Sequence, residues 1–416
     1  MNLDSRQDFA IDIQTSKPKL WNMNYVNTLT VNLIINISSM ILITVLPLFT
    51  MSIGGNNLIA GLLMTLLTMS ALIFRPFFGK MLDNKGRKIV LILGLCLFSL
   101  STILLLASSN LFVLLILRFF QGIGLSAYST ALGTIISDIV PTTRISEGVG
   151  YFGISGTIAM AIAPTLGLYL SAKYGYQVTY IVTSGIALFS VLFASLINYE
   201  NKNKNNLEIN QEDITIVHET VILTLKSPDK GFIEKSSVRP CIVMFFIVFA
   251  VSSVFSFMPI FGKARDIDNI GLFFTFYAVS MILSRIVTGK IADRYGFLIA
   301  FLPGITITFM LFLTLSFAKS LPVILLAAIF YGVGYGMVQP IMNAIVIKRS
   351  SPERRGAANA TYYATMDIGF GMGSLVWGII SQLAGFTAVF LGCALCIVIS
   401  VLAYYLILHR FHVNNG

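Results

Sequence analysis

The stretch RPFFGKMLDNKGRK, Arg75–Lys88, returns in altered form 210 positions later as RIVTGKIADRYGFL, Arg285–Leu298. In both copies an arginine lies four residues before a glycine, and an aspartate lies four residues after that glycine. Only 11% of the residues in this chain are charged, so two such similar charged segments indicate an internal duplication. The chain is therefore predicted to consist of two related halves.

The repeat continues on both sides of these segments. Gly122 and Gly124 match Gly332 and Gly334 at the same offset. Shifted by one further residue, the matched pairs are Pro141 with Pro352, Arg144 with Arg355, Tyr151 with Tyr362, and Gly167 with Gly378. The one long hydrophilic stretch, about residues 199–239, separates the two copies and has the composition of a linker.

The composition is that of an integral membrane protein. Hydrophobic residues make up 56% of the chain and the mean hydropathy is +0.84, which is more apolar side chain than a soluble core can hide. A helix of about 20 apolar residues crosses a bilayer. Twelve such runs are present, at about 27–50, 57–78, 88–107, 110–134, 146–170, 176–198, 240–261, 269–288, 297–318, 321–345, 357–382 and 386–408. These runs are continuously apolar, whereas the strands of a membrane barrel alternate between apolar and polar residues.

The predicted fold class is thus all-α, with twelve transmembrane helices in two pseudo-symmetric six-helix bundles. The predicted units are an N-terminal tail (1–26), a first bundle (27–198), a linker (199–239), a second bundle (240–408) and a C-terminal tail (409–416). The opening segment is polar and has no apolar core, so it does not resemble a cleaved signal peptide.

The net charge of +10 first suggests a nucleic-acid partner, but its distribution favours a topological role. If the N-terminus is inside, the outer loops contain only four of the 28 basic residues: Lys173, Lys263, Arg265 and Lys319. An excess of Lys and Arg on the inner side orients membrane proteins. We therefore expect both termini in the cytoplasm, a location in the cell membrane, the lipid bilayer as a partner, and no nucleic acid.

The cysteines and histidines do not form a metal site or a catalytic site in the sequence. The four cysteines, Cys96, Cys241, Cys393 and Cys396, lie in or at the ends of predicted spans, with spacing that matches no metal site, and are interpreted as packing residues. The three histidines, His218, His409 and His412, lie in the linker or the tail. A membrane-embedded enzyme is therefore disfavoured, and no metal or cofactor is expected.

Three segments resemble motifs of the major facilitator superfamily, the family of twelve-helix secondary transporters. The segment at Arg75–Lys88 resembles the motif between the second and third helices, with Gly79, Asp83, Gly86, Arg87 and Lys88 in the expected places. LRFFQGIG, Leu117–Gly124, resembles the fourth-helix motif with its buried arginine, Arg118. GTIAMAIAPTLG, Gly156–Gly167, is similar to the fifth-helix motif of proton-driven exporters, although Ala163 and Leu168 replace two glycines. The resemblance implies a substrate site between the halves, near the membrane midplane.

The first motif implies a conformational latch. Gly79 and Gly86 are expected to let the backbone turn sharply at the membrane surface. By resemblance, Asp83 faces the start of the eleventh helix near Gly356 and Ala357, where a helix N-terminus favours an anion, and Arg87 pairs with Asp138. The second copy keeps Gly289 and Asp293 but has Phe297 in place of the arginine, so its latch is expected to be partial. The alternative is that these charges only anchor a loop.

Two residues of fixed charge, Arg118 and Asp367, are predicted near the middle of spans, where a charge is costly and is a functional candidate by default. Neither is duplicated, since their counterparts are Ala328 and Gly156. Burial and a nearby cation have opposite effects on the ionisation of a carboxyl group. We therefore predict that Asp367, near Arg118, loads and releases the coupling proton. The alternative is that each residue only holds helices together.

Further polar residues are candidates for the lining of the substrate cavity: Asn32, Asn36, Gln121, Tyr128, Tyr277, Tyr335, Gln339 and Asn343. For each of them, hydrogen bonding between helices is an alternative role. Gly156, Pro164 and Gly167 are expected to permit close packing and a bend in the fifth helix.

The leading functional hypothesis is a proton-driven exporter of amphipathic or cationic small molecules, acting as a monomer with the proton gradient as its driving force. A major facilitator carrier of a sugar, a siderophore-like metabolite or a lipid headgroup, working outward or inward, is the alternative. A transport-inactive sensor or scaffold is a more remote alternative.

Overall fold

The computed structural model describes residues 20–108, 110–141, 144–198, 234–295, 297–351 and 354–406. These residues are almost entirely helical, and no strand occurs among them. The helices of the first half are α1 (Met23–Ser52), α2 (Asn57–Lys85), α3 (Arg87–Leu104) with the short η1 (Leu105–Ala107), α4 (Leu111–Ile139) and α5 (Ile145–Ser195). The helices of the second half are α8 (Lys235–Ala264), α9 (Leu272–Tyr295), α10 (Phe297–Phe317), α11 (Leu321–Arg349) and α12 (Arg355–Tyr404).

Two helices are twice as long as a membrane crossing requires. α5 has 51 residues and α12 has 50, and each contains one glycine with non-helical backbone angles. At Gly175 φ is 82°, and at Gly385 φ is 77°, values that an L-residue with a side chain rarely adopts. Each glycine therefore breaks its helix into two passes, at the places where the sequence predicts a loop between consecutive spans.

The number of membrane crossings agrees with the sequence-based prediction. Of the described helices, nine are long and apolar enough to cross a membrane, and α5 and α12 are among them. α9 has a shorter apolar part, Leu272–Thr288. Counting α5 and α12 twice and adding α9 gives twelve crossings. The predicted all-α membrane fold is confirmed.

Several helices extend beyond the predicted spans. α2 continues to Lys85, α4 to Ile139 and α9 to Tyr295, and α8 begins at Lys235, inside the segment predicted to be linker. The predicted boundaries follow the loss of hydropathy at charged residues. A helix, however, continues past the edge of the apolar layer as long as its backbone hydrogen bonds are satisfied.

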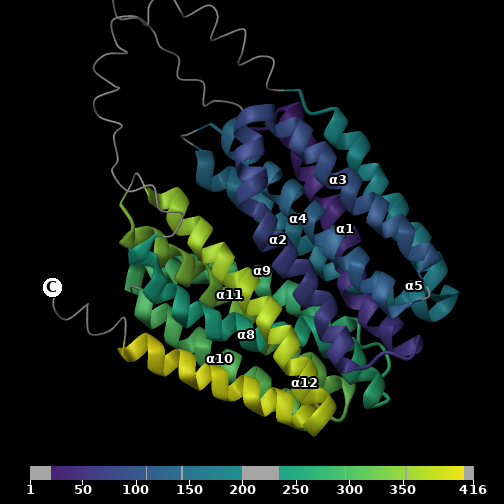
Figure 1. The fold of residues 1–416 in the computed structure, drawn as a ribbon. Coiled ribbons are helices and arrows are strands. Elements are labelled where there is room, and N and C mark those ends of the chain that lie inside the picture. The colour runs from purple at the N-terminus through teal and green to yellow at the C-terminus, as the bar shows by residue number, and fades with distance from the viewer. Residues whose placement is uncertain are drawn as a thin grey trace, which may run out of the picture.

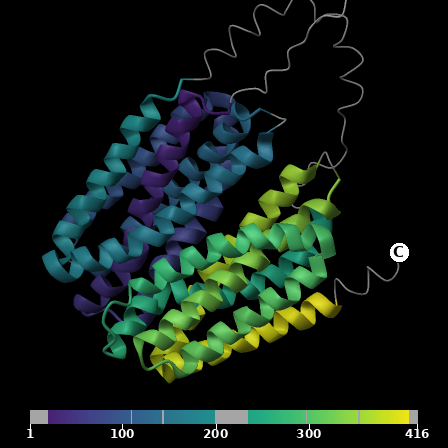
Figure 2. The ribbon, with the colours of Figure 1, turned by 180° about the vertical axis from the view of Figure 1, so that it is seen from behind.

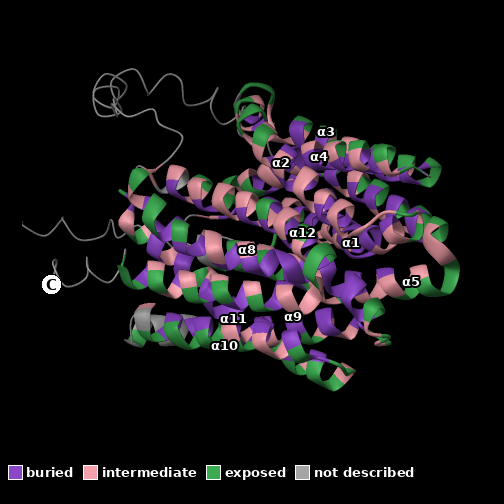
Figure 3. Ribbon diagram, turned by 60° about the horizontal axis from the view of Figure 1, so that its bottom comes forward, coloured by how far each residue is buried: buried purple, intermediate pink, exposed green. Residues whose placement is uncertain are grey.

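The two halves form separate helical bundles, each with its own hydrophobic core (Figures 1 and 2). One core cluster contains residues from Val31 to Ile197, and a second contains residues from Cys241 to Tyr404 together with Ala60 of α2. Coloured by burial, the helices show buried residues toward the interior and exposed ones, many of them large and apolar, toward the outside (Figure 3). This is the distribution expected for a surface that faces lipid.

The duplication is visible in the packing of equivalent helices. A Cβ atom at Gly122 of α4 would overlap the carbonyl oxygen of Leu67 in α2, and one at Gly332 of α11 would overlap that of Tyr277 in α9. Leu67 and Tyr277 are themselves 210 residues apart. Both glycines therefore allow the same close approach of two helix backbones, once in each half.

The halves contact each other mainly at one end. We call the end at which α5 ends and α8 begins the linker end, and the opposite end the loop end. Near the loop end, Thr65 Oγ1 donates to the carbonyl oxygen of Gly371 at 2.8 Å, and Thr165 Oγ1 lies 3.1 Å from Thr275 Oγ1. From there the two bundles diverge toward the linker end (Figures 1 and 2).

Candidate functional site

An ion pair joins the two halves, between α2 and the first pass of α12. Arg75 Nη2 of α2 lies 2.7 Å from Asp367 Oδ2 of α12, and the two side chains are 30% and 20% exposed. Oδ2 has no partner with the alignment of a hydrogen bond, so the contact is electrostatic. The two side chains are thus partly exposed, the contacting oxygen is buried, and the pair is held by charge across the interface.

Arg285 of α9 is the repeat counterpart of Arg75, and it also reaches the other half. Its Nη2 donates to Gln339 Oε1 in α11 at 2.6 Å, and its Nη1 donates to Thr157 Oγ1 in α5 at 3.4 Å. Thr157 follows Gly156, which is the counterpart of Asp367. The two arginines thus occupy equivalent positions, but Arg75 contacts a carboxylate whereas Arg285 contacts two neutral acceptors.

Tyr363 precedes Asp367 by one helical turn on α12. The residue is 45% exposed, and its hydroxyl group is within electrostatic range of both Arg285 and Arg75. Together, Arg75, Arg285, Tyr363 and Asp367 gather charged and polar groups from both halves; we call them the central cluster.

The comparison with known families agrees with this architecture. The family model described as Major Facilitator Superfamily matches residues 28–350 and 266–415. The chain belongs to the major facilitator superfamily. It is therefore a multi-pass membrane transporter and not an enzyme, and members of this superfamily bind small-molecule substrates within the membrane.

Its relatives are distant but match almost over their full length. An uncharacterized MFS-type transporter of Methanocaldococcus jannaschii is 22% identical over 86% of this chain and 92% of its own. The multidrug resistance protein MdtG of Salmonella typhimurium is 25% identical, over 83% of this chain and 85% of its own.

Among solved structures, a point mutant of the nucleoside transporter NupG superposes with a TM-score of 0.73 at 14% identity, covering 93% of this chain and all of its own. The human organic anion transporter MFSD10 superposes with a TM-score of 0.64 at 18% identity, covering 92% of this chain and 98% of its own. At these identities the structures show that the fold is shared and nothing further.

Arg118 does not lie beside Asp367, although the sequence predicts that it does. Arg118 is only 1% exposed and donates to Gln121 Oε1 at 3.0 Å, within the core of the first half. Asp367 is paired with Arg75 instead, so the expectation that Asp367 lies beside Arg118 is wrong. The reason is that α12 packs on α2 and α8, while α4 packs on α2 and α3.

Most predicted cavity residues are packed inside one half. Gln121, Tyr128, Tyr277 and Tyr335 are buried, and Tyr277 stacks on Tyr331 with ring centroids 4.3 Å apart. Three predicted residues are partly exposed, namely Asn36, Gln339 and Asn343. Of these candidates, Gln339 accepts a hydrogen bond from the central cluster, through Arg285.

Asn32 connects two helices of the first half. Its amide donates to Ser155 Oγ at 2.7 Å and to the carbonyl oxygen of Phe152 at 3.2 Å, both in α5, and it also accepts from Asn36 at 2.9 Å. In this conformation Asn32 therefore holds α1 against α5, which is the alternative role considered for it.

The predicted packing motif of α5 is only partly realised. A Cβ atom at Gly167 would lie 3.0 Å from Ile41 Cγ2 and 3.1 Å from Val45 Cγ2, so α1 and α5 approach closely there. A Cβ atom at Gly156 would meet nothing within 4 Å, so the expectation of close packing at Gly156 is wrong. Pro164 lies inside α5, as expected.

One contact expected for the latch motif is present, the one made by its arginine. Arg87 Nε lies 3.2 Å from Asp138 Oδ2, the pair that the resemblance implies. Gly86, with φ of 93°, makes the turn between α2 and α3. Gly79 continues α2, so the turn expected there is wrong. Gly289 lies within α9, and the side chains of Asp83 and Asp293 lie outside what the structure describes.

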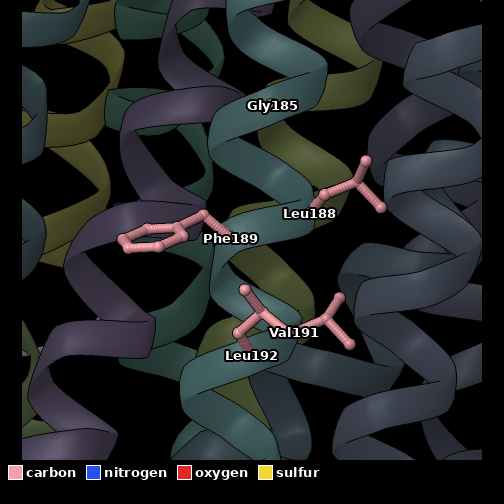
Figure 4. A pocket seen from close by; sticks show the side chains of 5 residues that line it. All are labelled: Gly185, Leu188, Phe189, Val191 and Leu192. Atoms are coloured by element: carbon pink, nitrogen blue, oxygen red, sulfur yellow. The ribbon is translucent and has the colours of Figure 1, made fainter.

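Two further features of the described residues do not contribute to a site. No group of three or more His, Cys, Asp or Glu among them could hold a metal ion, and their four cysteines are free. An apolar notch lined by Gly185, Leu188, Phe189, Val191 and Leu192 lies on the second pass of α5 (Figure 4). Leu188, Phe189 and Leu192 are exposed large apolar side chains, so the notch belongs to the apolar outer surface.

Proposed function

We propose that this transporter exports amphipathic small molecules in exchange for protons, by alternating access, with the central cluster as the coupling site. The observation that carries the proposal is the Arg75–Asp367 contact, which joins the two halves through one carboxylate and one cation. The similarity to multidrug resistance proteins and the exporter-like segment at Gly156–Gly167 support the outward direction.

The ion pair offers a mechanism for proton coupling. A nearby cation stabilises an ionised carboxylate, whereas burial in an apolar environment disfavours it. Arg75 and Asp367 belong to different halves, so a rocking motion of the halves changes their separation. The protonation of Asp367 thereby depends on which end of the molecule is open, which is the requirement for an exchanger.

The distribution of basic residues supports an orientation with the linker end in the cytoplasm. Lys85, Arg87, Lys348 and Arg349 lie at linker-end helix termini, and the outer loops contain few Lys and Arg. With this orientation, the described conformation is closed toward the outside and divergent toward the cytoplasm.

The test is gradient-driven transport by Asp367→Asn in proteoliposomes. Asparagine resembles a permanently protonated aspartate, so we expect cargo binding to persist while accumulation against a gradient falls by at least about tenfold and loses its pH dependence. Asp266→Asn, on the loop between α8 and α9, is the matched control and should pump as the wild type does. Normal gradient-driven pumping by Asp367→Asn would refute the coupling role. Lower thermal stability as its only defect would indicate a structural role.

A further inference from the structure

The charges in the middle of the membrane do not balance. Among the described residues, those of fixed charge near the middle of the spans are Arg75, Arg118, Arg285 and Asp367. Asp367 neutralises Arg75, and Arg118 is enclosed within the first half. Arg285 is therefore the cation that lies at the interface without a carboxylate partner.

The surroundings of Arg285 fit a binding residue. Thr157 and Gln339 accept hydrogen bonds from two of its five N–H donors and fix the direction of the guanidinium group. The side chain is partly exposed, and its Nε has no partner although it is buried. A cation that costs free energy at this depth and has only neutral partners is a functional candidate.

Three tyrosines of the second half interact electrostatically with this cation. The hydroxyl groups of Tyr335, Tyr362 and Tyr363 are within electrostatic range of Arg285. Tyr363, which is 45% exposed, also interacts electrostatically with Arg75. A phenol O–H can donate a hydrogen bond to an anion beside a guanidinium group. Arg285 and Tyr363 come from α9 and α12, so one anionic group between them would contact two helices.

We propose that Arg285, with Tyr363, binds an anionic group of the cargo, such as a carboxylate or a sulfonate. The proposal rests on the proposed transport function and names the cargo class. Guanidinium groups bind such oxyanions through paired, charge-assisted hydrogen bonds. A cationic cargo would meet a like charge here, so the proposed cargo is an amphipathic anion, in place of the amphipathic or cationic cargo that the sequence predicts.

The test uses three probes that share one aromatic body: 1-pyrenebutyrate, 1-pyrenesulfonate and 1-pyrenemethylammonium. Binding to the detergent-solubilised full chain is measured by fluorescence anisotropy, which does not require transport. We expect the wild type to bind at least one of the two anions more tightly than the ammonium. Arg285→Gln should weaken anion binding by about tenfold, the value of one charge-assisted hydrogen bond. Arg285→Lys, which keeps the charge but loses the planar fork, should weaken it less.

The control is Arg265→Gln, which removes an arginine of the same half near the loop end, where it donates to Thr387. This variant should bind all three probes as the wild type does. Size-exclusion chromatography and thermal unfolding establish that each variant is folded. If Arg285→Gln does not fold, Arg285→Lys is used to test the anion site instead. Its ratio of anion affinity to ammonium affinity is expected to lie between the wild-type ratio and unity.

The outcomes separate this inference from the proposed function. Preferential binding of the ammonium by the wild type, unchanged anion binding by Arg285→Gln, or an equal loss for all three probes would each overturn the anion site. If the wild type binds an anion through Arg285 but does not transport it when a proton gradient is imposed in either direction, the anion site stands and the proposed exchange fails.

Discussion

Arg75 and Asp367 form an ion pair that is neither fully buried nor fully exposed. Exposed ion pairs contribute about 0–1 kcal/mol, whereas breaking a fully buried pair costs about 3–5 kcal/mol because one charge is left without compensation. With 30% of the Arg75 side chain and 20% of the Asp367 side chain exposed, water compensates part of that loss. An interaction of intermediate strength suits a contact that has to form and separate during every transport cycle.

A double-mutant cycle at this pair measures that strength. Arg75→Gln alone leaves Asp367 without its cation and should lower the free energy of unfolding by about 1–3 kcal/mol, which is the buried-pair loss reduced for exposure. Asp367→Asn in addition removes the stranded charge. We therefore expect the double variant to be more stable than Arg75→Gln, as measured by thermal unfolding in detergent. Additive effects of the two substitutions would show that the residues do not interact.

The sequence predicts part of this site, and the limit has a physical reason. Asp367 is recognisable because a carboxylate in a long apolar run is costly. Arg75 lies only a few residues before the predicted end of its span, so it resembles a residue at the membrane surface, although α2 continues to Lys85. Pairing depends on which helices face each other across the halves. Hydropathy does not contain that information. The repeat of Arg75 as Arg285 is a sequence signal that marks Arg75 as a candidate site residue.

At the scale of elements, the starts of α8 and α12 are tied together at the linker end. Arg354 Nε donates to Glu234 Oε2, and the backbone N–H of Glu234 donates to Thr361 Oγ1 at 3.1 Å. The hydrogen bond from Arg354, with a smaller effect of Ser236, holds the pKa of Glu234 below its ordinary value. Glu234 is therefore ionised in the folded protein and caps α8 at the same time.

Glu234→Gln should reduce stability in a pH-dependent way. A carboxyl group with a lowered pKa stabilises the fold fully above its unfolded value of about 4.3, and this contribution is lost as the pH falls through the folded value. Glutamine keeps the capping oxygen but not the charge. We expect a lower midpoint of thermal unfolding than in the wild type at pH 7, and a difference that shrinks once the pH falls below about 4.3 and disappears below the folded pKa of Glu234. A constant difference across this range would exclude the charge as its cause.

Helices as elements are the best-predicted level of this structure, because each apolar run has to satisfy its own backbone hydrogen bonds in lipid. The breaks at Gly175 and Gly385 coincide with predicted loops. A connection this short needs a residue that accepts a positive φ, and glycine does so readily. The helix ends are predicted less well. Charged residues end the apolar run but not the helix, as α8 and α9 show at the linker end.

At the scale of the whole molecule, the two bundles are joined near the loop end and diverge toward the other end (Figure 1). The contacts between halves that hold the loop end closed are hydrogen bonds and close helix packing, such as the approach of Gly378 in α12 to the start of α2. Such contacts can open without separating buried charges. Transport by alternating access requires that they do open in every cycle.

A cross-link between Thr165 of α5 and Thr275 of α9 tests this requirement. Their hydroxyl oxygens are 3.1 Å apart, so sulfur atoms at the same positions start close to the S–S bonding distance of about 2 Å. The exposed native Cys96 is replaced by serine to avoid other cross-links. Oxidation of the double-cysteine variant should fix the loop end in its closed state and reduce transport by at least about tenfold, because one of the two open states can no longer form. A reducing agent should restore transport, and each single-cysteine variant should be insensitive to oxidant. Full transport by a quantitatively cross-linked protein would show that the halves do not separate at α5 and α9, and the rocking motion that links Arg75 to Asp367 would then have to be abandoned.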